Sequence, residues 1–343
     1  MTILLYILLG ISVLAPIYTY AVYPFVLRLF KPRSRETKDE YCPEVSVLII
    51  GVDEEKCKEK ERNVRASDYP NITEIIIVKN QHEAVALLKK KKGGVVVITD
   101  QDSVFLGDTI TNVIKPLLEP FVGCVSGMVR KRPNEQGEYQ DGANWKYENK
   151  IKELESNIGC LSGANTSIYA FNRAYIPDEF DERINLDFYI PTSSIEWGFD
   201  VLFEPKSVAY EPSDRTETDL FWKHVADGAS GYCSIVRFRR LLLPKKGSFV
   251  FWSHRVMKWL VPFNMLILLI VCAVLAFHYK WALLLLLAQV LFYVVVAGYY
   301  QQYTKAEREL PGPLGKLLGF ASYFVVLNVA WLLGLFSINK ERL

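Results

Sequence analysis

The distribution of apolar and polar positions divides the chain into four parts. Residues 3–30 form an almost uncharged run that is long enough for a membrane-spanning helix. Residues 40–218 mix charged and apolar positions as a soluble domain does, and residues 219–258 follow the pattern of amphipathic helices at a membrane interface. Residues 259–343 return to long apolar runs, which predict three C-terminal spans. These spans are Leu260–Phe277, Trp281–Tyr300 and Leu317–Phe336.

Basic residues beside these runs predict how the chain is oriented in a membrane. Some follow the first run, at Lys31, Arg33, Arg35 and Lys38. Others lie between the last two spans, at Lys305, Arg308 and Lys316. Because positive charges favour the cytoplasmic side, we expect a multi-pass protein of the cell membrane with a cytoplasmic soluble domain. The linker at His278 would then lie outside. The C-terminus would also lie outside, although the basic tail 339–342 argues against that.

Within the soluble domain, apolar stretches typical of buried strands alternate with helix-like stretches. Strands are predicted at Glu44–Ile50, Glu74–Val78 and Val95–Ile98, each followed by a helix, the last of which runs to about Leu118. This order predicts a parallel, right-handed sheet. Later strands are predicted at Phe121–Arg130, Thr166–Phe171 and Asp200–Pro205, with two helical stretches within 142–159 and one helix that ends at Gly198. The predicted fold class is α/β, with a doubly wound, mostly parallel sheet and α-helical transmembrane segments.

Two carboxylates follow the third strand, where its apolar run ends. Asp100 and Asp102 lie at i and i+2, so in an extended segment their side chains point the same way. Ligands of open α/β sheets bind at the carboxyl ends of the strands. Mg²⁺ and Mn²⁺ take oxygen ligands and are often shared with substrate phosphates. The pattern suits a metal site, and it equally suits a solvated turn, in which aspartate is common.

Composition narrows the classes of function. The chain has 343 residues, 50% of them hydrophobic, and a formal net charge of +2, so its total charge gives no indication of a nucleic-acid partner. Its six cysteines show no metal-ligand spacing, and in a cytosolic domain we expect them to be reduced. The C-terminal runs contain few polar groups, which argues against a transporter or a receptor.

The order and spacing of six segments resemble the membrane-anchored family 2 glycosyltransferases. The segments are EVSVLIIGVDEE, SDYPNITEIIIV, VVVITDQDS, VGCVSGMV, LSGANTSIYAFNR and NLDFYIPTSSIEWGFDVLFEPKSVAYE. This group includes cellulose, chitin and hyaluronan synthases and many capsule and exopolysaccharide transferases. The resemblance covers residues from about 40 to 265 and implies a GT-A fold for the soluble domain.

The resemblance implies roles for three carboxylates. Asp100 and Asp102 match the D-x-D motif, which holds Mn²⁺ or Mg²⁺ against the diphosphate of a nucleotide sugar. Asp187 lies eleven residues before Gly198, the spacing of the catalytic acid in the family. In an inverting displacement it would be the general base for the acceptor hydroxyl. Leu186 replaces the acid that precedes it in the family. Taken without the resemblance, Asp187 also suits a helix cap.

The resemblance also assigns binding segments. The nucleotide sugar is expected to contact Gly51, Val52, Asp53, Glu54, Lys79 and Asp100. The donor and acceptor sugars are expected to contact Ser162, Gly163, Ala164, Asn165 and Trp145. The residues alone allow other roles, because Asp53 and Glu54 suit a helix start, segment 162–165 suits a tight turn, and Trp145 suits helix packing.

Departures from the family pattern concern the nucleotide. Lys79 stands where an acidic residue is usual, and Val52 replaces an aromatic residue of the nucleobase loop. The Q-x-x-R-W motif of processive synthases is absent, which leaves Lys223 or His224 as the expected contact with the diphosphate. The amphipathic segment ends in basic residues that suit an anionic bilayer surface. These are Arg237, Arg239 and Arg240.

Two functions are therefore expected. The first is an inverting, metal-dependent glycosyltransferase that moves a sugar from a nucleotide-diphosphate donor, expected to be a UDP-sugar, to a hydroxyl of a lipid-linked or growing saccharide at the cytoplasmic membrane face. The second is a catalytically weakened homologue that acts as a binding or scaffold subunit of a polysaccharide assembly. Four spans are few for a secretion channel. A homo-oligomer or a polysaccharide-export partner would supply the further spans that such a channel needs.

Overall fold

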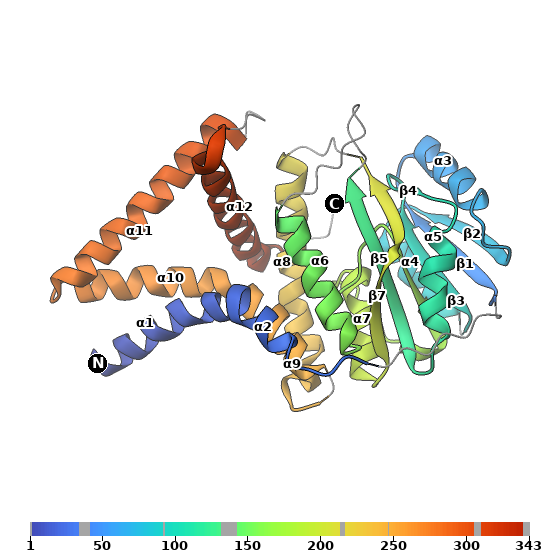
Figure 1. The fold of residues 1–343 in the computed structure, drawn as a ribbon, viewed down its shortest axis with the longest axis horizontal. Coiled ribbons are helices and arrows are strands. Elements are labelled where there is room, and N and C mark those ends of the chain that lie inside the picture. The colour runs from blue at the N-terminus through green and yellow to red at the C-terminus, as the bar shows by residue number, and fades with distance from the viewer. Residues whose placement is uncertain are drawn as a thin grey trace. The chain divides into compact units, whose positions relative to one another are not determined.

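The computed structural model describes the chain as two compact units (Figure 1). The described residues are 2–33, 42–91, 93–131, 143–212, 217–245, 247–304 and 310–338. The sheet unit comprises Pro24–Asp214 and Ser234–Trp252. The helical unit comprises Met1–Tyr23, Arg215–Cys233 and Ser253–Leu343. The predicted orientation in the membrane depends partly on residues outside the described ranges. These are Arg35, Lys38, Lys305, Arg308 and tail residues 339–342.

The sheet unit is built on a mixed sheet, which has seven strands in the described part of the chain, in the order β2-β1-β3-β6-β5-β7-β4. The strands are β1 Val45–Ile50, β2 Ile72–Val78, β3 Val95–Asp100, β4 Val104–Phe105, β5 Val122–Lys131, β6 Tyr169–Asn172 and β7 Asp200–Glu211. β1 pairs in parallel with β2 and β3, and β5 pairs in parallel with β7. β6 lies antiparallel between β3 and β5, and β4 is antiparallel to β7.

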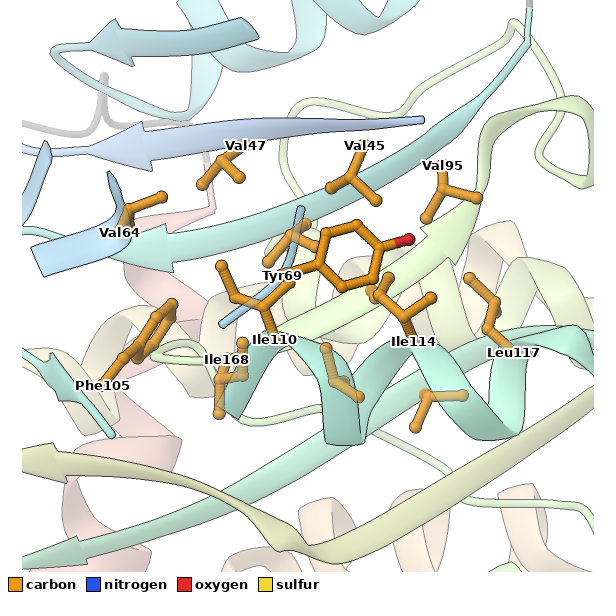
Figure 2. Packing of buried hydrophobic residues seen from close by; sticks show 14 of the residues in the cluster. Val45, Val47, Val64, Tyr69, Val95, Phe105, Ile110, Ile114, Leu117 and Ile168 are labelled. Carbon is orange, nitrogen blue, oxygen red and sulfur yellow. The ribbon is translucent and has the colours of Figure 1, made fainter. Parts of the chain in front are cut away.

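Helices cover this sheet and bury both faces of its central strands. They are α3 Glu54–Arg65, α4 Gln81–Lys90, α5 Thr109–Ile114, α6 Ala143–Asn157 and α7 Leu186–Glu196. Figure 2 shows Ile110 and Ile114 of α5 facing Val45 and Val47 of β1. The alternate residue Leu48 is also buried, at 3% exposure. Burial on both faces explains the continuous apolar runs of the sequence and confirms the predicted α/β class.

Several elements differ in detail from the predicted ones. The helix expected directly after Asp102 begins only at Thr109, because the short strand β4 comes first and pairs with β7. The two helical stretches expected within 142–159 form the single helix α6. The last predicted strand continues past Pro205, where the register between β5 and β7 shifts. Such a shift suits proline, which has no N–H for a strand ladder.

The described residues contain four helices that are long and apolar enough to cross a membrane. They are Thr2–Leu27, Ser248–Ala276, Lys280–Thr304 and Gly312–Ser337. Each overlaps one predicted span. The amphipathic segment forms α8, Glu217–Arg237. The next apolar helix begins at Ser248, so it includes the last residues of the predicted amphipathic segment.

Small residues allow close packing inside the helical unit. A Cβ added at Gly228 of α8 would lie 2.8 Å from the Cα atom of Trp331 in α12, Gly312–Gly334. A Cβ at Gly334 would lie 2.6 Å from the backbone N of Ala229. Glycines at a helix contact let two backbones approach closely, as in helices packed within membranes.

Candidate active site

The loops after three parallel strands begin at the same edge of the sheet. Ile50, the last residue of β1, lies opposite Val78 of β2 and Asp100 of β3 in the strand registers. The segments 51–53, 79–80 and 101–103 therefore start side by side. This is the edge at which open α/β sheets bind ligands.

Asp100 and Asp102 belong to a tight turn at this edge. Asp100 Oδ1 accepts hydrogen bonds from the backbone N–H groups of Asp102 at 3.1 Å and Ser103 at 2.8 Å. Asp100 Oδ2 accepts from Ser167 Oγ at 2.6 Å. Asp102 is 27% exposed in its side chain and accepts from Lys56 Nζ at 2.9 Å. These bonds hold both carboxylates at the sheet edge.

A buried lysine supports the turn from α3. Lys60 is 2% exposed, and its ammonium donates to the backbone O of Ser103 at 2.8 Å and to Ser103 Oγ at 3.0 Å. The ammonium also lies 3.3 Å from the centre of the Phe105 ring, a cation–π contact. Burial lowers the pKa of Lys60 to about 7, although the Asp100 carboxylate acts in the opposite direction. The sequence analysis missed this residue.

Gln101 connects the loop after β1 with the loop after β3. Its side-chain Oε1 atom accepts from the backbone N–H of Asp53 at 2.9 Å, and its backbone N–H donates to the carbonyl of Ile50 at 3.1 Å. Its side chain fills the space beside Gly51, where an added Cβ would lie 2.3 Å from Gln101 Oε1. Asp53 caps the N-terminus of α3 by accepting from two backbone N–H groups of the first turn. The structure therefore gives Asp53 the helix-start role that the sequence also allowed.

The other expected nucleotide contacts are exposed at the same edge. Val52 is 79% exposed, so its side chain is open to solvent beside the turn. Glu54 pairs with Lys58 at 2.6 Å, and this partner lowers the pKa of the Glu54 carboxyl. The backbone N–H of Lys79 donates to the Glu83 carboxylate at 2.8 Å, and Lys79 is exposed.

Two adjacent residues link the Asp100 turn to Asp187. Ser167 donates to Asp100, and Thr166 Oγ1 donates to Asp187 Oδ2 at 3.1 Å. Asp187 lies in the first turn of α7, and its backbone carbonyl accepts from the N–H of Ala164 at 2.7 Å. Burial, and to a lesser extent the Asp187 carboxylate, raises the pKa of Tyr169 on β6. The catalytic candidate and the D-x-D turn are therefore each one hydrogen bond away from the same dipeptide.

A third carboxylate, which the sequence analysis missed, reaches this dipeptide. Glu211 ends β7, and its Oε1 atom lies 2.5 Å from Ser167 Oγ. Ser167 is fully buried, and its hydroxyl contacts both Glu211 and Asp100. Because a hydroxyl donates one proton, only one carboxylate can accept it at a time. Two acidic groups therefore face each other across Ser167.

The segment expected beneath the sugars is anchored in the sheet unit. Ser162 is 2% exposed, and its Oγ atom donates to Glu155 at 2.9 Å. Gly163 is buried next to it. Asn165 is half-buried and accepts from Lys152 through its side-chain oxygen. These contacts hold the loop in place within the sheet unit. Thr166, which follows the loop, is exposed.

Trp145 is half-buried on α6. Its ring N–H donates to the carbonyl of Val129 on β5 at 2.7 Å. The Arg130 guanidinium lies 5.5 Å from the ring centre. Trp145 therefore packs its helix on the sheet, a role that the sequence also allowed.

The expected diphosphate contacts lie on α8 in the helical unit. Lys223 is exposed there. His224 Nδ1 lies 3.7 Å from Asp227 Oδ2, and the His224 ring meets the Tyr323 ring edge-on at 6.1 Å. Their contact with a diphosphate stays a prediction.

The residues at the turn suit a hard divalent cation. Asp100 and Asp102 provide carboxylate oxygens, which Mg²⁺ and Mn²⁺ prefer. In the described part of the chain, no group of three or more His, Cys, Asp or Glu side chains is arranged to hold a metal. Two carboxylates provide only part of the six oxygen ligands that Mg²⁺ requires, so the other ligands would have to come from water or substrate oxygens.

Comparison with known proteins gives no match to a protein-family model and none to a curated protein. Among solved structures, the chain is similar to the mannosyltransferase PcManGT from Pyrobaculum calidifontis in complex with GDP-Man and Mn²⁺. The identity is 16% and the TM-score 0.68, over 97% of this chain and 100% of that chain. GalNAc-T7 with UDP, GalNAc and Mn²⁺ also matches, with 12% identity and a TM-score of 0.35, over 70% of this chain and 64% of that chain. The likeness to the mannosyltransferase shows that this chain has a glycosyltransferase fold.

Proposed function

We propose that this protein is a membrane-bound glycosyltransferase that moves a sugar from a nucleotide-diphosphate donor to a hydroxyl acceptor. The observation that carries the proposal is the convergence of Asp100 and Asp187 on Thr166 and Ser167. This arrangement lies at the edge where open α/β sheets bind ligands, in a fold similar to that of the mannosyltransferase, and both points support the proposal.

The carboxylates have separate roles in this proposal. Asp100 and Asp102 would hold Mn²⁺ or Mg²⁺, and the bound cation would neutralise charge on the departing nucleotide diphosphate. Lys60 and the backbone N–H groups of Asp102 and Ser103 fix the turn before the donor arrives. Asp187 takes the proton from the acceptor hydroxyl as its oxygen attacks the anomeric carbon. A single displacement inverts the configuration at that carbon, as the family 2 resemblance implies.

We propose a lipid-linked or growing saccharide at the cytoplasmic membrane face as the acceptor. The four apolar helices support a membrane location, which gives access to a lipid-linked substrate. A UDP-sugar is the donor that the family resemblance suggests. The similar mannosyltransferase structure contains GDP-Man, so both nucleotides belong in a donor screen.

The test separates the two carboxylate roles in detergent-purified protein. Asp102→Ala should lose both nucleotide binding in Mn²⁺ and sugar transfer. Asp187→Asn should keep nucleotide binding, while its transfer rate falls by roughly two or more orders of magnitude, the usual scale for a positioned general base. Asp108→Asn, at an exposed aspartate outside the site, serves as the matched control. Calorimetric binding of the nucleotide diphosphates is measured beside the transfer rate.

Each result has a distinct meaning. If Asp187→Asn transfers sugar at the unmodified rate, the base lies elsewhere and Asp187 only starts its helix. If the unmodified protein binds no nucleotide with Mn²⁺ present, catalysis is the wrong function and the scaffold role in a polysaccharide assembly replaces it.

A further inference from the structure

The sheet unit contains a second site at the opposite end of the strands from the D-x-D turn. A cavity of about 800 Å³ is lined by six residues within 173–179, by the end of α7 and by four residues within 236–240. Arg173 follows β6, whose last residue Asn172 lies opposite Val95, the first residue of β3. Asp100 is the last residue of β3. The cavity is therefore separate from the proposed catalytic edge.

Two of the arginines that line this cavity form no ion pair within the described part of the chain. The four arginines of the cavity are Arg173, Arg237, Arg239 and Arg240. Arg173 pairs with Asp178 at 2.5 Å, and Arg237 pairs with Glu196 at 3.3 Å. Arg239 and Arg240 are exposed, and neither forms an ion pair with any residue that the structure describes. Glu179 is the one remaining carboxylate of the cavity lining. Two guanidinium groups are thus available for an anion, whose oxygens they can bind in a bidentate manner.

Apolar side chains border the same cavity. Trp197 and Val236 line it and are 63% and 67% exposed. Leu242 and Leu243, just after the arginines, are 41% and 62% exposed. Large apolar side chains gathered in water-exposed positions mark contact surfaces. A lining that combines arginines with exposed apolar side chains suits an amphipathic ligand better than a free anion.

The position in the chain limits how far these arginines can lie from the start of an apolar helix. Ser248 begins an apolar helix long enough to cross a membrane, and Arg240 precedes it by eight residues. Eight residues span at most about 28 Å when fully extended. The cavity therefore stays within reach of lipid headgroups if this helix enters the membrane.

We propose that this cavity binds the headgroup of an anionic phospholipid, with Arg239 and Arg240 on its phosphate and its acyl chains along Trp197 and Val236. The bound lipid fixes the sheet unit to an anionic leaflet. The inference rests on the membrane location in the proposed function, and it does not depend on the chemistry at Asp100.

Native mass spectrometry of the full-length protein tests this site. The probes are dioleoyl phosphatidylglycerol and dioleoyl phosphatidylcholine at equal concentration. We expect the unmodified protein to retain phosphatidylglycerol roughly tenfold more strongly or better, because phosphatidylcholine carries the same phosphate but places a choline cation near the arginines, which repel it. Arg239→Gln/Arg240→Gln should lose this preference. Lys90→Gln/Lys206→Gln, which removes the same charge at two exposed lysines of the sheet unit, should keep it.

Further arms identify the ligand and keep the test independent of folding. Nucleotide and Mn²⁺ binding at the D-x-D turn should be the same in both double variants as in the unmodified protein. A double variant that loses this binding is misfolded. The single variants Arg239→Gln and Arg240→Gln then replace it. Equal retention of the two lipids by the unmodified protein overturns the proposal, as does an unchanged preference in the arginine variants. Displacement of the lipid by millimolar inorganic phosphate would show that the cavity takes free phosphate and would overturn the lipid assignment.

Discussion

At the scale of single residues, Lys60 is an amine buried beside the proposed metal turn. Its pKa of about 7 lies below that of a lysine in an unfolded chain, which is near 10.5. Between these values the unfolded chain binds a proton that the folded protein has lost. Raising the pH through this window therefore favours the folded state, by up to about 1.4 kcal/mol per pH unit from this group.

We predict that Lys60→Met flattens this part of the stability profile. Unfolding by urea is followed in EDTA at several values between pH 7 and pH 10, so that no metal affects the carboxylates. The free energy of unfolding of the unmodified protein should rise more steeply with pH than that of Lys60→Met. Lys90→Met, at an exposed lysine, provides the comparison. Parallel profiles for the unmodified protein and Lys60→Met would show that the buried amine keeps an ordinary pKa.

Some of the site could be predicted from the sequence and some could not. Asp100 and Asp102 follow directly from a strand pattern, because the end of an apolar run fixes where a parallel strand meets the ligand edge. Lys60 had a local signal, since it lies between Cys57 and Val64 on the buried side of α3. Glu211 had none, because its contact with Ser167 depends on long-range pairing in the sheet.

At the scale of elements, Arg33 connects the segment after the first apolar helix to the sheet unit. Its guanidinium lies 2.6 Å from Glu119 and 2.6 Å from Asp200, whose side chains are 2% and 9% exposed. Its backbone N–H donates to the carbonyl of Asn157. The sequence analysis counted Arg33 only as a charge that orients the chain. The structure shows that this single charge also pairs with two buried carboxylates.

We predict that Arg33→Ala destabilises the sheet unit by about 3 kcal/mol or more, the usual effect of leaving a buried charge without its partner. The measurement is the free energy of unfolding in denaturant. Adding Glu119→Gln and Asp200→Asn to Arg33→Ala should recover part of the loss, because no uncompensated charge then remains. A triple variant less stable than Arg33→Ala would mean that the hydrogen bonds matter more than the charges.

The order of elements was predictable only as far as local pattern determines pairing. The first three strands alternate with helices, and this arrangement predicts their parallel pairing. The antiparallel strand β6 has the same apolar pattern as a parallel one. Its insertion between β3 and β5 could therefore not be read from its residues. This insertion brings Thr166 and Ser167 to Asp187 and Asp100, so the central feature of the site depends on it.

At the scale of the whole molecule, the length of the product is the first question. The Q-x-x-R-W motif of processive synthases is absent, and Lys223 and His224 lie on α8 in that part of the chain. If the protein is the proposed glycosyltransferase, we predict addition of one or a few sugars, because the sequence lacks the motif that binds the diphosphate in the processive synthases it resembles. Mass spectrometry of the products decides the point. A high-molecular-weight polymer made by the purified protein alone would contradict this prediction.

The orientation of the protein in the membrane requires labelling sites chosen from the structure. Cys57 is unsuitable, because it is 2% exposed and burial, followed by the charges of Asp53 and Asp102, raises the pKa of its thiol. It would stay unlabelled on either side of a membrane. Cys42 is exposed and has to be replaced by serine before other positions are tested.

We predict that the sheet unit lies in the cytoplasm and that the linker between α10, Met257–Ala276, and α11, Lys280–Tyr299, lies outside. In a Cys42→Ser background, an impermeant thiol reagent should label His278→Cys in intact cells, because that residue lies in the linker. It should label Lys90→Cys, on the exposed face of α4, only after the cells are permeabilised. Labelling of Lys90→Cys in intact cells, with His278→Cys protected, would place the sheet unit outside, where neither a cytoplasmic nucleotide sugar nor the inner leaflet could reach it.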